Sequence, residues 1–364
     1  MSKRKSDNTR RDFIKNSALA LGGFYILPRH VLGGKGFTAP SDKLQVAGIG
    51  AGGKGESDLF AFYNSGKADI AFLCDVDERP AASKRKQFPK AKFYKDWREM
   101  FDKESKHFDA VTVAIPDHNH ALVGLSAMQL KKHLYLQKPL THDIYEARIL
   151  TQAAEKYKVV TQMGDQGASC DGMRTMREWF EADLIGDIEK VYCWTDRPVW
   201  PQGIAWPKTK PPIPKELNWD LWLGTAQKTN YIDNLVPFNW RGWWEFGTGA
   251  LGDMGCHIYD PTFKALGLTY PISLRSTGPS PNEHNWGVDA VIEYLFPKTS
   301  FSKGSTLPVT WYDGSARPPA RVASLLEGKS LPKQGSVIIG TEGVMLLPHL
   351  GMPSLYPQKK FNEF

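Results

Sequence analysis

Cysteine is scarce in this chain of 364 residues, and its placement argues against several classes of site. The four cysteines lie far apart, and none has a spacing typical of metal ligands: Cys74, Cys170, Cys193 and Cys256. We therefore expect no metal site. Disulfides are possible in an exported protein, but the sequence does not pair them. Cys74 sits in an apolar strand pattern and fits a small core residue.

The chain also has little excess of positive charge once the first residues are set aside. The formal net charge is +7, but residues 1–43 hold nine Lys and Arg against three Asp and Glu, which is +6. The rest of the chain therefore carries about +1, so its basicity gives no support for a large anionic partner. We expect no nucleic acid to bind this protein.

Long apolar segments are lacking as well. The run from Ala18 to Leu27 is too short for a stable membrane span, and we expect none in the mature chain. The run follows the adjacent pair Arg10 and Arg11 in TRRDFIK, and this pattern resembles a twin-arginine export signal. A basic amphipathic helix is the alternative, but the run has no polar face. We expect residues 1–34 to be signal and linker, and the protein to be periplasmic or otherwise exported, already folded around its cofactor.

A glycine-rich loop opens the folded part. An apolar strand pattern, residues 44–49, leads into a G-x-G-x-x-G motif and then a helical pattern from Glu56: Gly48, Gly50 and Gly53. The first glycine permits a tight turn, the second a close approach of the backbone to a pyrophosphate, and the third close packing of the helix. The helix N-terminus then faces the phosphates. The motif predicts a dinucleotide site.

The next strand indicates which dinucleotide binds. It ends in Asp75, about twenty residues beyond the glycine loop, where an acid binds a ribose 2′-hydroxyl. A carboxylate there repels a 2′-phosphate, so NAD is favoured over NADP. Three basic residues follow closely and keep NADP possible: Arg79, Lys84 and Arg85. The alternative for Asp75 is a turn residue at the end of a strand.

Strand and helix patterns alternate up to residue 165, which predicts an α/β domain with a parallel, doubly wound sheet over residues 44–165. Ligands of such sheets lie beyond the carboxyl ends of the strands. Several polar or rigid residues follow strand ends, and we expect them to converge on one cleft: Asp75, Pro116, His120, Gln137 and Lys138.

The chain from about Leu44 onward resembles the family of glucose–fructose oxidoreductase, inositol dehydrogenase and MocA. Segments resembling family landmarks occur in the right order: the glycine loop, YKDWREM at 94–100, AIPDHNH at 114–120, QKP at 137–139, LIGDI at 184–188 and GTGALGDMGCHIYD at 247–260. Each segment is weak alone, whereas the ordered set is specific for the family but not for a substrate. The resemblance implies a Rossmann domain followed by an α+β domain with an open, largely antiparallel sheet, which we place at 166–364.

The resemblance also implies catalytic residues. The lysine of the family's Glu-Lys-Pro motif corresponds to Lys138, although Gln137 stands where many members have glutamate. The family's Asp and His four residues apart correspond to Asp253 and His257. With Asp260 they would share one face of a helix, where a His flanked by carboxylates can accept a proton. The alternatives are a helix cap for Asp253, a core histidine for His257 and a surface turn for Lys138.

The second half of the chain is rich in tryptophan, and most of these rings are expected to be structural while a few line a sugar pocket. We assign Trp240 and Arg241, with Asp260, to substrate binding. The proline-rich segment 206–219 predicts an extended arm, which in this family often helps subunits associate, so we expect a homo-oligomer. Family members usually continue beyond the last residue with a helical segment, which suggests a C-terminal truncation.

Three functions compete at this point. The first is an NAD(P)-dependent oxidoreductase with tightly bound cofactor, in which a hydroxyl of a sugar or glycoside loses its proton to His257 or Lys138. The second is a redox-neutral, NAD-dependent glycoside hydrolase on the same scaffold, since free NAD should be scarce outside the cytoplasm. The third is a sugar-binding protein without turnover.

Overall fold

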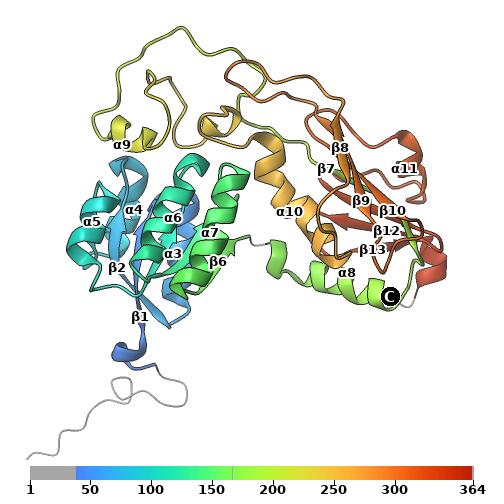
Figure 1. Ribbon diagram of the computed structural model, residues 1–364, viewed down its shortest axis with the longest axis horizontal. Helices are drawn as coiled ribbons and strands as arrows, with labels where there is room; N and C mark the ends of the chain where they lie inside the picture. The colour runs from blue at the N-terminus through green and yellow to red at the C-terminus, as the bar shows by residue number, and fades with distance from the viewer. Residues whose placement is uncertain (1–37, 166, 363–364) are drawn as a thin grey trace, which may run out of the picture.

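The computed structural model describes residues 38–165 and 167–362 of the chain. The twin-arginine pattern and the apolar run behind it lie outside these residues. Two sheets organise the described part, one in each half of the sequence (Figure 1). In the part of the chain that is described, no helix is both long and apolar enough to cross a membrane.

The first sheet has six parallel strands in the order β3-β2-β1-β4-β5-β6. Its strands are β1 (Leu44–Ile49), β2 (Ala68–Cys74), β3 (Lys92–Tyr94), β4 (Ala110–Val113), β5 (His133–Gln137) and β6 (Thr161–Gly164). The helices between them are α3 (Gly53–Asn64), α4 (Glu78–Gln87), α5 (Trp97–Glu104), α6 (His120–Gln129) and α7 (Ile144–Tyr157). This is the predicted doubly wound sheet, and the strand order reverses between β1 and β4, where such folds bind ligands.

Local signals set several of these helices. An aspartate side chain caps the first turn of three of them by accepting from a backbone N–H: Asp77 for α4, Asp96 for α5 and Asp143 for α7. In α7 the Glu146 side chain bonds back to the cap, which completes a capping box. The core beneath them is apolar on both faces of the sheet, as expected for parallel strands.

The second sheet has seven strands in the order β13-β12-β11-β7-β10-β9-β8, and all neighbours are antiparallel except β7 and β10. The strands are β7 (Ile188–Trp194), β8 (Ser273–Ser276), β9 (Val291–Pro297), β10 (Thr306–Tyr312), β11 (Gly335–Gly340), β12 (Val344–Pro348) and β13 (Ser354–Tyr356). The largely antiparallel second sheet predicted from the resemblance is therefore present.

Helices cover this sheet unequally. One face packs on α8 (Asp171–Glu181) and α10 (Gly249–Ala265) through a large apolar core. The other face meets residues in and after the short helix α11 (Ala320–Ser324). The segment that becomes α10 was expected to be helical, and it leads from the edge of the first domain to the second sheet (Figure 1).

One long connection leaves the second domain and returns over the first. We call residues 196–246, between β7 and α10, the strap; it contains the short helix α9 (Trp219–Leu223) and the 3₁₀ turn η4 (Asn239–Gly242). In Figure 1 the strap carries α9 to the edge of the first domain beyond α4 and α6. Its aromatic residues form a core of their own, in which Trp219 and Trp222 stack at 4.8 Å.

Candidate active site

A cavity of about 420 Å³ lies where the carboxyl ends of β1, β2, β4 and β5 meet the strap, and its volume is typical of ligand pockets. Gly50 and Asp75 line one end, and Lys138 and Asp253 line the other. Residues of the strap, including Trp222, contribute to its wall. The cavity therefore joins the predicted dinucleotide loop to two of the predicted catalytic residues, Lys138 and Asp253.

The glycine loop is built so that the backbone itself faces this cavity. Gly50 has a φ of 81°, and a Cβ there would lie 2.2 Å from the Ala114 carbonyl oxygen. Gly53 has a φ of 54° with open space around it and begins α3. The tight helix contact predicted for Gly53 is made instead by Gly55, where a Cβ would lie 1.8 Å from the Gly50 oxygen. Gly48 packs under Leu59. Bare backbone N–H groups at a helix N-terminus fit a pyrophosphate.

Asp75 directly follows β2 and is tied to the glycine loop. One carboxylate oxygen accepts from the backbone N–H of Ala51 and Gly52 at 2.9 and 3.2 Å, and the other accepts from Asp77 N–H at 3.0 Å. Burial raises the pKa of Asp75 to about 6, although these N–H groups oppose the shift. The acid thus stands at the cavity wall where a ribose hydroxyl is recognised in such folds.

The basic residues that follow Asp75 all have acidic partners. Arg79 forms a forked pair with Asp77 at 2.8 and 2.6 Å, Lys84 lies 3.4 Å from Glu56, and Arg85 lies 2.9 Å from Glu78. A 2′-phosphate would have to compete with each of these carboxylates. The sequence alone could not show the pairing of Lys84 with Glu56, because Glu56 lies on α3 and Lys84 on α4.

The other predicted cofactor residues have distinct places. Pro116 and Gln137 line the cavity. His120 is 1% exposed, and its ring nitrogens lie 2.8 Å from the Pro139 carbonyl oxygen and 2.7 Å from that of Ile115. His120 thus ties the loop after β4 to the loop after β5. It is placed behind the cavity wall, where it holds the two loops that carry Pro116 and Lys138.

Gln137 is buried, and its amide donates to the Asp58 carboxylate on α3 at 2.6 Å. We expect Gln137→Glu to destabilise the fold by about 1–3 kcal/mol at pH 8, because two carboxylates would then meet at this distance. The like charge raises the pKa of the new carboxyl in the folded state, so the loss grows as pH rises and shrinks as pH falls. Thermal unfolding at pH 5 and pH 8 measures it. The double variant Gln137→Glu/Asp58→Asn should recover most of the stability, and equal instability of the two variants would contradict the explanation.

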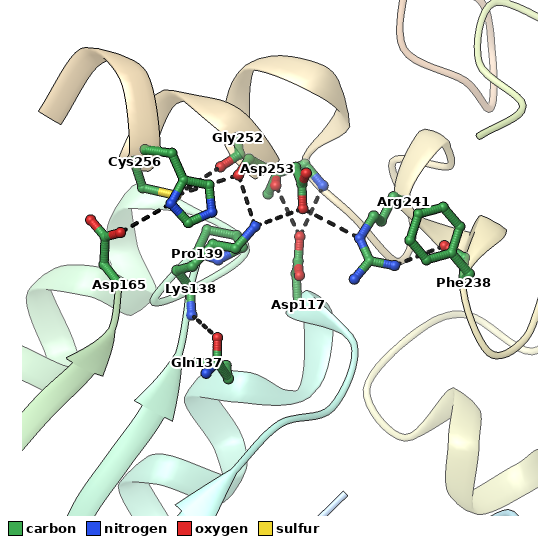
Figure 2. Close-up of polar contacts among 12 residues, drawn as sticks. Asp117, Gln137, Lys138, Pro139, Asp165, Phe238, Arg241, Gly252, Asp253 and Cys256 are labelled. Carbon is green, nitrogen blue, oxygen red and sulfur yellow. Dashed lines mark hydrogen bonds and ion pairs between the residues drawn. The ribbon is translucent and has the colours of Figure 1, made fainter. Parts of the chain in front are cut away.

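Lys138, Asp253 and Arg241 all line the cavity and form an ion cluster (Figure 2). Lys138 Nζ donates to the Asp253 carboxylate and to its carbonyl oxygen, both at 2.8 Å, and Arg241 Nε donates to the same carboxylate oxygen at 3.3 Å. Burial raises the pKa of Asp253, but the two cations outweigh it and lower that pKa below its usual value. Residues from β5, η4 and α10 thus meet at one carboxylate.

The predicted substrate residues divide into two groups. Trp240 and Arg241 line the cavity, and the Arg241 guanidinium lies 4.4 Å from the centre of the Trp240 ring and 4.5 Å from that of Phe238. Asp260 is not among the residues that line it, and its carboxylate lies 2.9 Å from Lys264. Helical spacing predicted that Asp260 would lie near Asp253, but Asp260 instead forms an ion pair with Lys264 on the same helix, α10.

His257 is buried at 7% exposure and contacts Asp165 rather than Asp253. Its Nδ1 lies 3.0 Å from an Asp165 carboxylate oxygen, and its ring centre lies 5.4 Å from that of His349. His257 lines a small separate cavity with His349 and not the large one. Asp165 was missed by the sequence reasoning, although its position directly after β6 is the signal that could have found it.

Asp117 is a second acid that the sequence reasoning left out. It follows β4 in the turn η2 (Asp117–Asn119), is 3% exposed, and lines the large cavity. One of its oxygens accepts from the Thr248 hydroxyl at 2.9 Å and from Thr248 N–H at 3.2 Å. Burial raises the pKa of Asp117 to about 7. The signal was again its place after a strand.

The chain was compared with known proteins. Residues 44–165 match the Gfo/Idh/MocA model described as an oxidoreductase family with an NAD-binding Rossmann fold, and residues 190–299 match that family's C-terminal alpha/beta domain. Levoglucosan dehydrogenase of Pseudarthrobacter phenanthrenivorans is 22% identical over 189 residues, which cover 52% of this chain and 40% of the relative. Glucose-6-phosphate 3-dehydrogenase of Bacillus subtilis is 28% identical over 116 residues, 32% of each chain. The chain thus spans less than half the length of these curated relatives.

Solved structures share the fold at low identity. The WlbA dehydrogenase from Chromobacterium violaceum, in complex with NADH and UDP-GlcNAcA, superposes with a TM-score of 0.59 at 15% identity, covering 84% of this chain and 74% of that one. GenD2 from gentamicin A biosynthesis, in complex with NAD, superposes with a TM-score of 0.59 at 17% identity, covering 89% of this chain and 75% of that one. With both halves matched by family models, the chain belongs to the Gfo/Idh/MocA family of oxidoreductases.

Proposed function

We propose that this protein is an NAD-dependent oxidoreductase that acts on a hydroxyl group of a sugar or glycoside and retains its cofactor through turnover. The observation that carries the proposal is the single cavity that joins the glycine loop and Asp75 to Lys138 and Asp253. A dinucleotide along this cavity would have its phosphates at the N-terminus of α3 and its far end near Lys138.

The residues present fit NAD. Gly50 leaves the loop backbone bare, Asp75 stands at the ribose position, and the nearby cations are already paired, which supports NAD over NADP. When bound, NAD supplies a nicotinamide that accepts the carbon-bound hydrogen together with its electron pair. Lys138 Nζ, a strong donor, would donate to the oxygen of the hydroxyl group whose carbon is oxidised. Asp253, which also accepts from Arg241, holds the Lys138 side chain in position.

The strap supports the retention of the cofactor. On one side of the cavity it is held by Asn218 N–H, which donates to the Val76 carbonyl at 2.8 Å. On the other side the Thr225 hydroxyl donates to the His118 carbonyl at 2.8 Å, and the Asn119 amide donates to the Trp222 carbonyl at 3.1 Å. A dinucleotide under the strap could leave only after these contacts open, so we expect slow release.

A carbohydrate substrate is supported by two observations. Two of the curated relatives are dehydrogenases of sugar compounds by name, levoglucosan and glucose 6-phosphate. The end of the cavity near Lys138 also presents Trp240 and the charged Arg241, a combination that suits the C–H face and the hydroxyls of a sugar. The particular sugar and the carbon oxidised do not follow from these contacts.

The test has two parts. The purified protein is denatured and the released small molecules are identified by mass spectrometry, and we expect NAD or NADH in near-stoichiometric amount. The folded protein is then mixed with a panel of sugars and glycosides while absorbance at the NADH band is followed. No bound nucleotide, together with no reduction of added NAD by any member of the panel, would refute the proposal.

The retained cofactor also favours a second candidate, a redox-neutral glycoside hydrolase that oxidises its substrate transiently and returns the electrons before release. The strap is the observation behind it, because a cofactor that does not exchange suits a reaction without net redox change. Release of the aglycone from a chromogenic glycoside without accumulation of NADH would favour hydrolysis. Accumulation of NADH with an oxidised sugar would favour the dehydrogenase.

We further propose that the chain is exported by the twin-arginine pathway, on the strength of TRRDFIK and the apolar run after it. Replacing Arg10 and Arg11 with lysine should leave the protein in the cytoplasm with its nucleotide still bound. Cell fractionation with a reporter fusion measures the distribution. Equal export of the Arg10→Lys/Arg11→Lys variant and the native chain would contradict this.

The homo-oligomer stays a prediction, and the edge strand β8 supports it. Tyr270, Ile272 and Leu274, in and just before β8, are 75%, 58% and 63% exposed, and they form an apolar row at the edge strand of the sheet that the described residues build. Light scattering on the purified protein determines the number of subunits.

A further inference from the structure

The proposed function leaves one acid of the large cavity without a task. Asp117 sits on the cavity wall at the start of η2, and only one of its oxygens is hydrogen bonded within the described residues, to the backbone and hydroxyl of Thr248. Since Asp117 is 3% exposed, its carboxyl is removed from bulk water. It also has no cation within ion-pair distance in the part of the chain that the structure describes.

The charged groups around Asp117 are already engaged with one another. Lys138 from the end of β5 and Arg241 from η4 both contact Asp253 on α10, and these three are the charges that act on Asp117 from neighbouring elements. His118, beside it in η2, is buried between backbone carbonyl groups, and burial lowers its pKa to about 4. Few groups near Asp117 are therefore able to accept a proton released by a substrate in this cavity.

The other ionisable residues that could accept the proton released from the substrate hydroxyl are each less suitable than Asp117. Lys138 Nζ already donates two hydrogen bonds to Asp253, one to its carboxylate and one to its carbonyl oxygen. Asp253 is kept ionised by Lys138 and Arg241. His257 contacts Asp165 and does not line the cavity. Asp117 has a free oxygen and faces the cavity.

We propose that Asp117 is the store for the hydroxyl proton: it takes up the proton released when the substrate hydroxyl is oxidised to a carbonyl, and it returns the proton when a carbonyl in the same site is reduced to a hydroxyl. The inference rests on the proposed function. Oxidation of one C–OH group to C=O removes two electrons with the carbon-bound hydrogen, which the nicotinamide accepts, and one proton from oxygen. That proton forms an O–H bond with the free oxygen of Asp117, so no other reactant is required. Burial, which raises the pKa of Asp117 to about 7, suits a group that gains and loses a proton near neutral pH.

Proton counting tests this directly. The protein with its bound NAD is mixed in dilute buffer with a sugar that reduces the nucleotide, and a pH-indicator dye is followed beside NADH absorbance. At pH 8, where Asp117 starts mainly ionised, we expect clearly less than one proton released per nucleotide reduced in the first turnover, before Asp117 exchanges protons with bulk water. Asp117→Asn should release one full proton per reduction, react roughly 10²-fold more slowly, and lose the pH dependence centred near 7. A full proton released by the native chain would overturn the inference.

The unfolding of the protein without sugar gives a second readout. The pKa of Asp117 is raised on folding, so its favourable contribution is present at low pH and is lost as pH rises through about 7. Asp117→Asn should therefore gain melting temperature over the native chain at pH 8 and not at pH 4. An identical pH dependence of melting in the two proteins would overturn the inference even if no sugar reduced the nucleotide, which would itself speak only against the proposed function.

Asp313 provides a matched control. It is buried at 2% exposure and its pKa is raised to about 6 by burial, but it lies after β10 in the second domain, bonded to Ala290 and Trp311. Asp313→Asn should also change the pH dependence of melting, yet leave the proton count unchanged. If Asp313→Asn altered the proton count as Asp117→Asn does, the effect would be a general one of buried carboxyls, and the store would not be Asp117.

Discussion

Replacement of Lys138 by methionine should lower turnover by roughly 10²–10⁴-fold while the nucleotide stays bound. Methionine keeps most of the apolar stem, so the local packing survives, but it removes the donor that faces the reacting oxygen. Asp253 would keep Arg241 at 3.3 Å, so the substitution does not leave this carboxylate without a cation. The measurement is the turnover number on a sugar found active in the panel, together with the nucleotide content of the denatured variant.

Lys106→Met is the matched control, because Lys106 is an exposed lysine of the same domain, after α5 and away from the cavity. It should retain full turnover and full nucleotide content. If Lys138→Met turned over within a few-fold of the native rate, Lys138 would have no part in the chemistry, and the third possibility of a sugar-binding protein would regain support.

Gly50→Ala is expected to abolish nucleotide binding. The added Cβ would lie 2.2 Å from the Ala114 carbonyl oxygen, far inside contact distance, and backbone atoms cannot rotate away as a side chain can. The loop would have to move away from β4, which displaces the N–H groups that face the phosphates. The variant should be isolated without nucleotide. Its melting temperature should also fall by more than the strain of a left-handed alanine would cause on its own.

Gly66→Ala is a control that separates the clash with the Ala114 carbonyl oxygen from the cost of placing alanine in a left-handed conformation. Gly66 has a φ of 71°, similar to the 81° of Gly50, but nothing lies within 4 Å of a Cβ built there, and it is outside the cavity. It should cost about 1–2 kcal/mol, the usual penalty for a left-handed alanine, and bind nucleotide normally. Retention of nucleotide by Gly50→Ala would mean that the dinucleotide does not lie against this loop.

The first domain could be predicted from the sequence because its signals are local. The glycine loop, Asp75 and the alternation of strands and helices each depend on neighbours within about thirty residues, and the doubly wound sheet they predict is present. The residues at strand ends also gather as expected, since parallel strands bring their carboxyl ends to one edge. The exception is His120, whose ring turns to two backbone carbonyls behind the cavity.

The contacts of the candidate site could not be predicted in the same way. Helical spacing grouped Asp253, His257 and Asp260 on one face, but each has a different partner. Asp253 contacts Lys138 and Arg241, His257 contacts Asp165, and Asp260 contacts Lys264. Two of these partners lie on other elements more than ninety residues away, and periodicity carries no information at that separation. The catalytic roles of Lys138, Asp253 and His257 stay predictions until they are tested.

The tryptophans show the same limit. Most of those in the second half are buried, as expected, and Trp222 and Trp240 line the cavity. Composition suggested an aromatic pocket, but it could not say that these rings reach the first domain on a segment that leaves the second. That placement depends on hydrogen bonds between the strap and residues 76–78 and 118–119, some from the backbone and some from the side chains of Asn119 and Thr225.

The position of the strap in the chain has a consequence for biosynthesis. Every residue of the parallel sheet leaves the ribosome before residue 196, so the N-terminal domain can fold while its nucleotide groove is still uncovered. The groove closes only when residues 216–225 have been made and have docked on it. The newly made chain thus passes through a period in which NAD can enter without any hydrogen bond of the finished protein having to break.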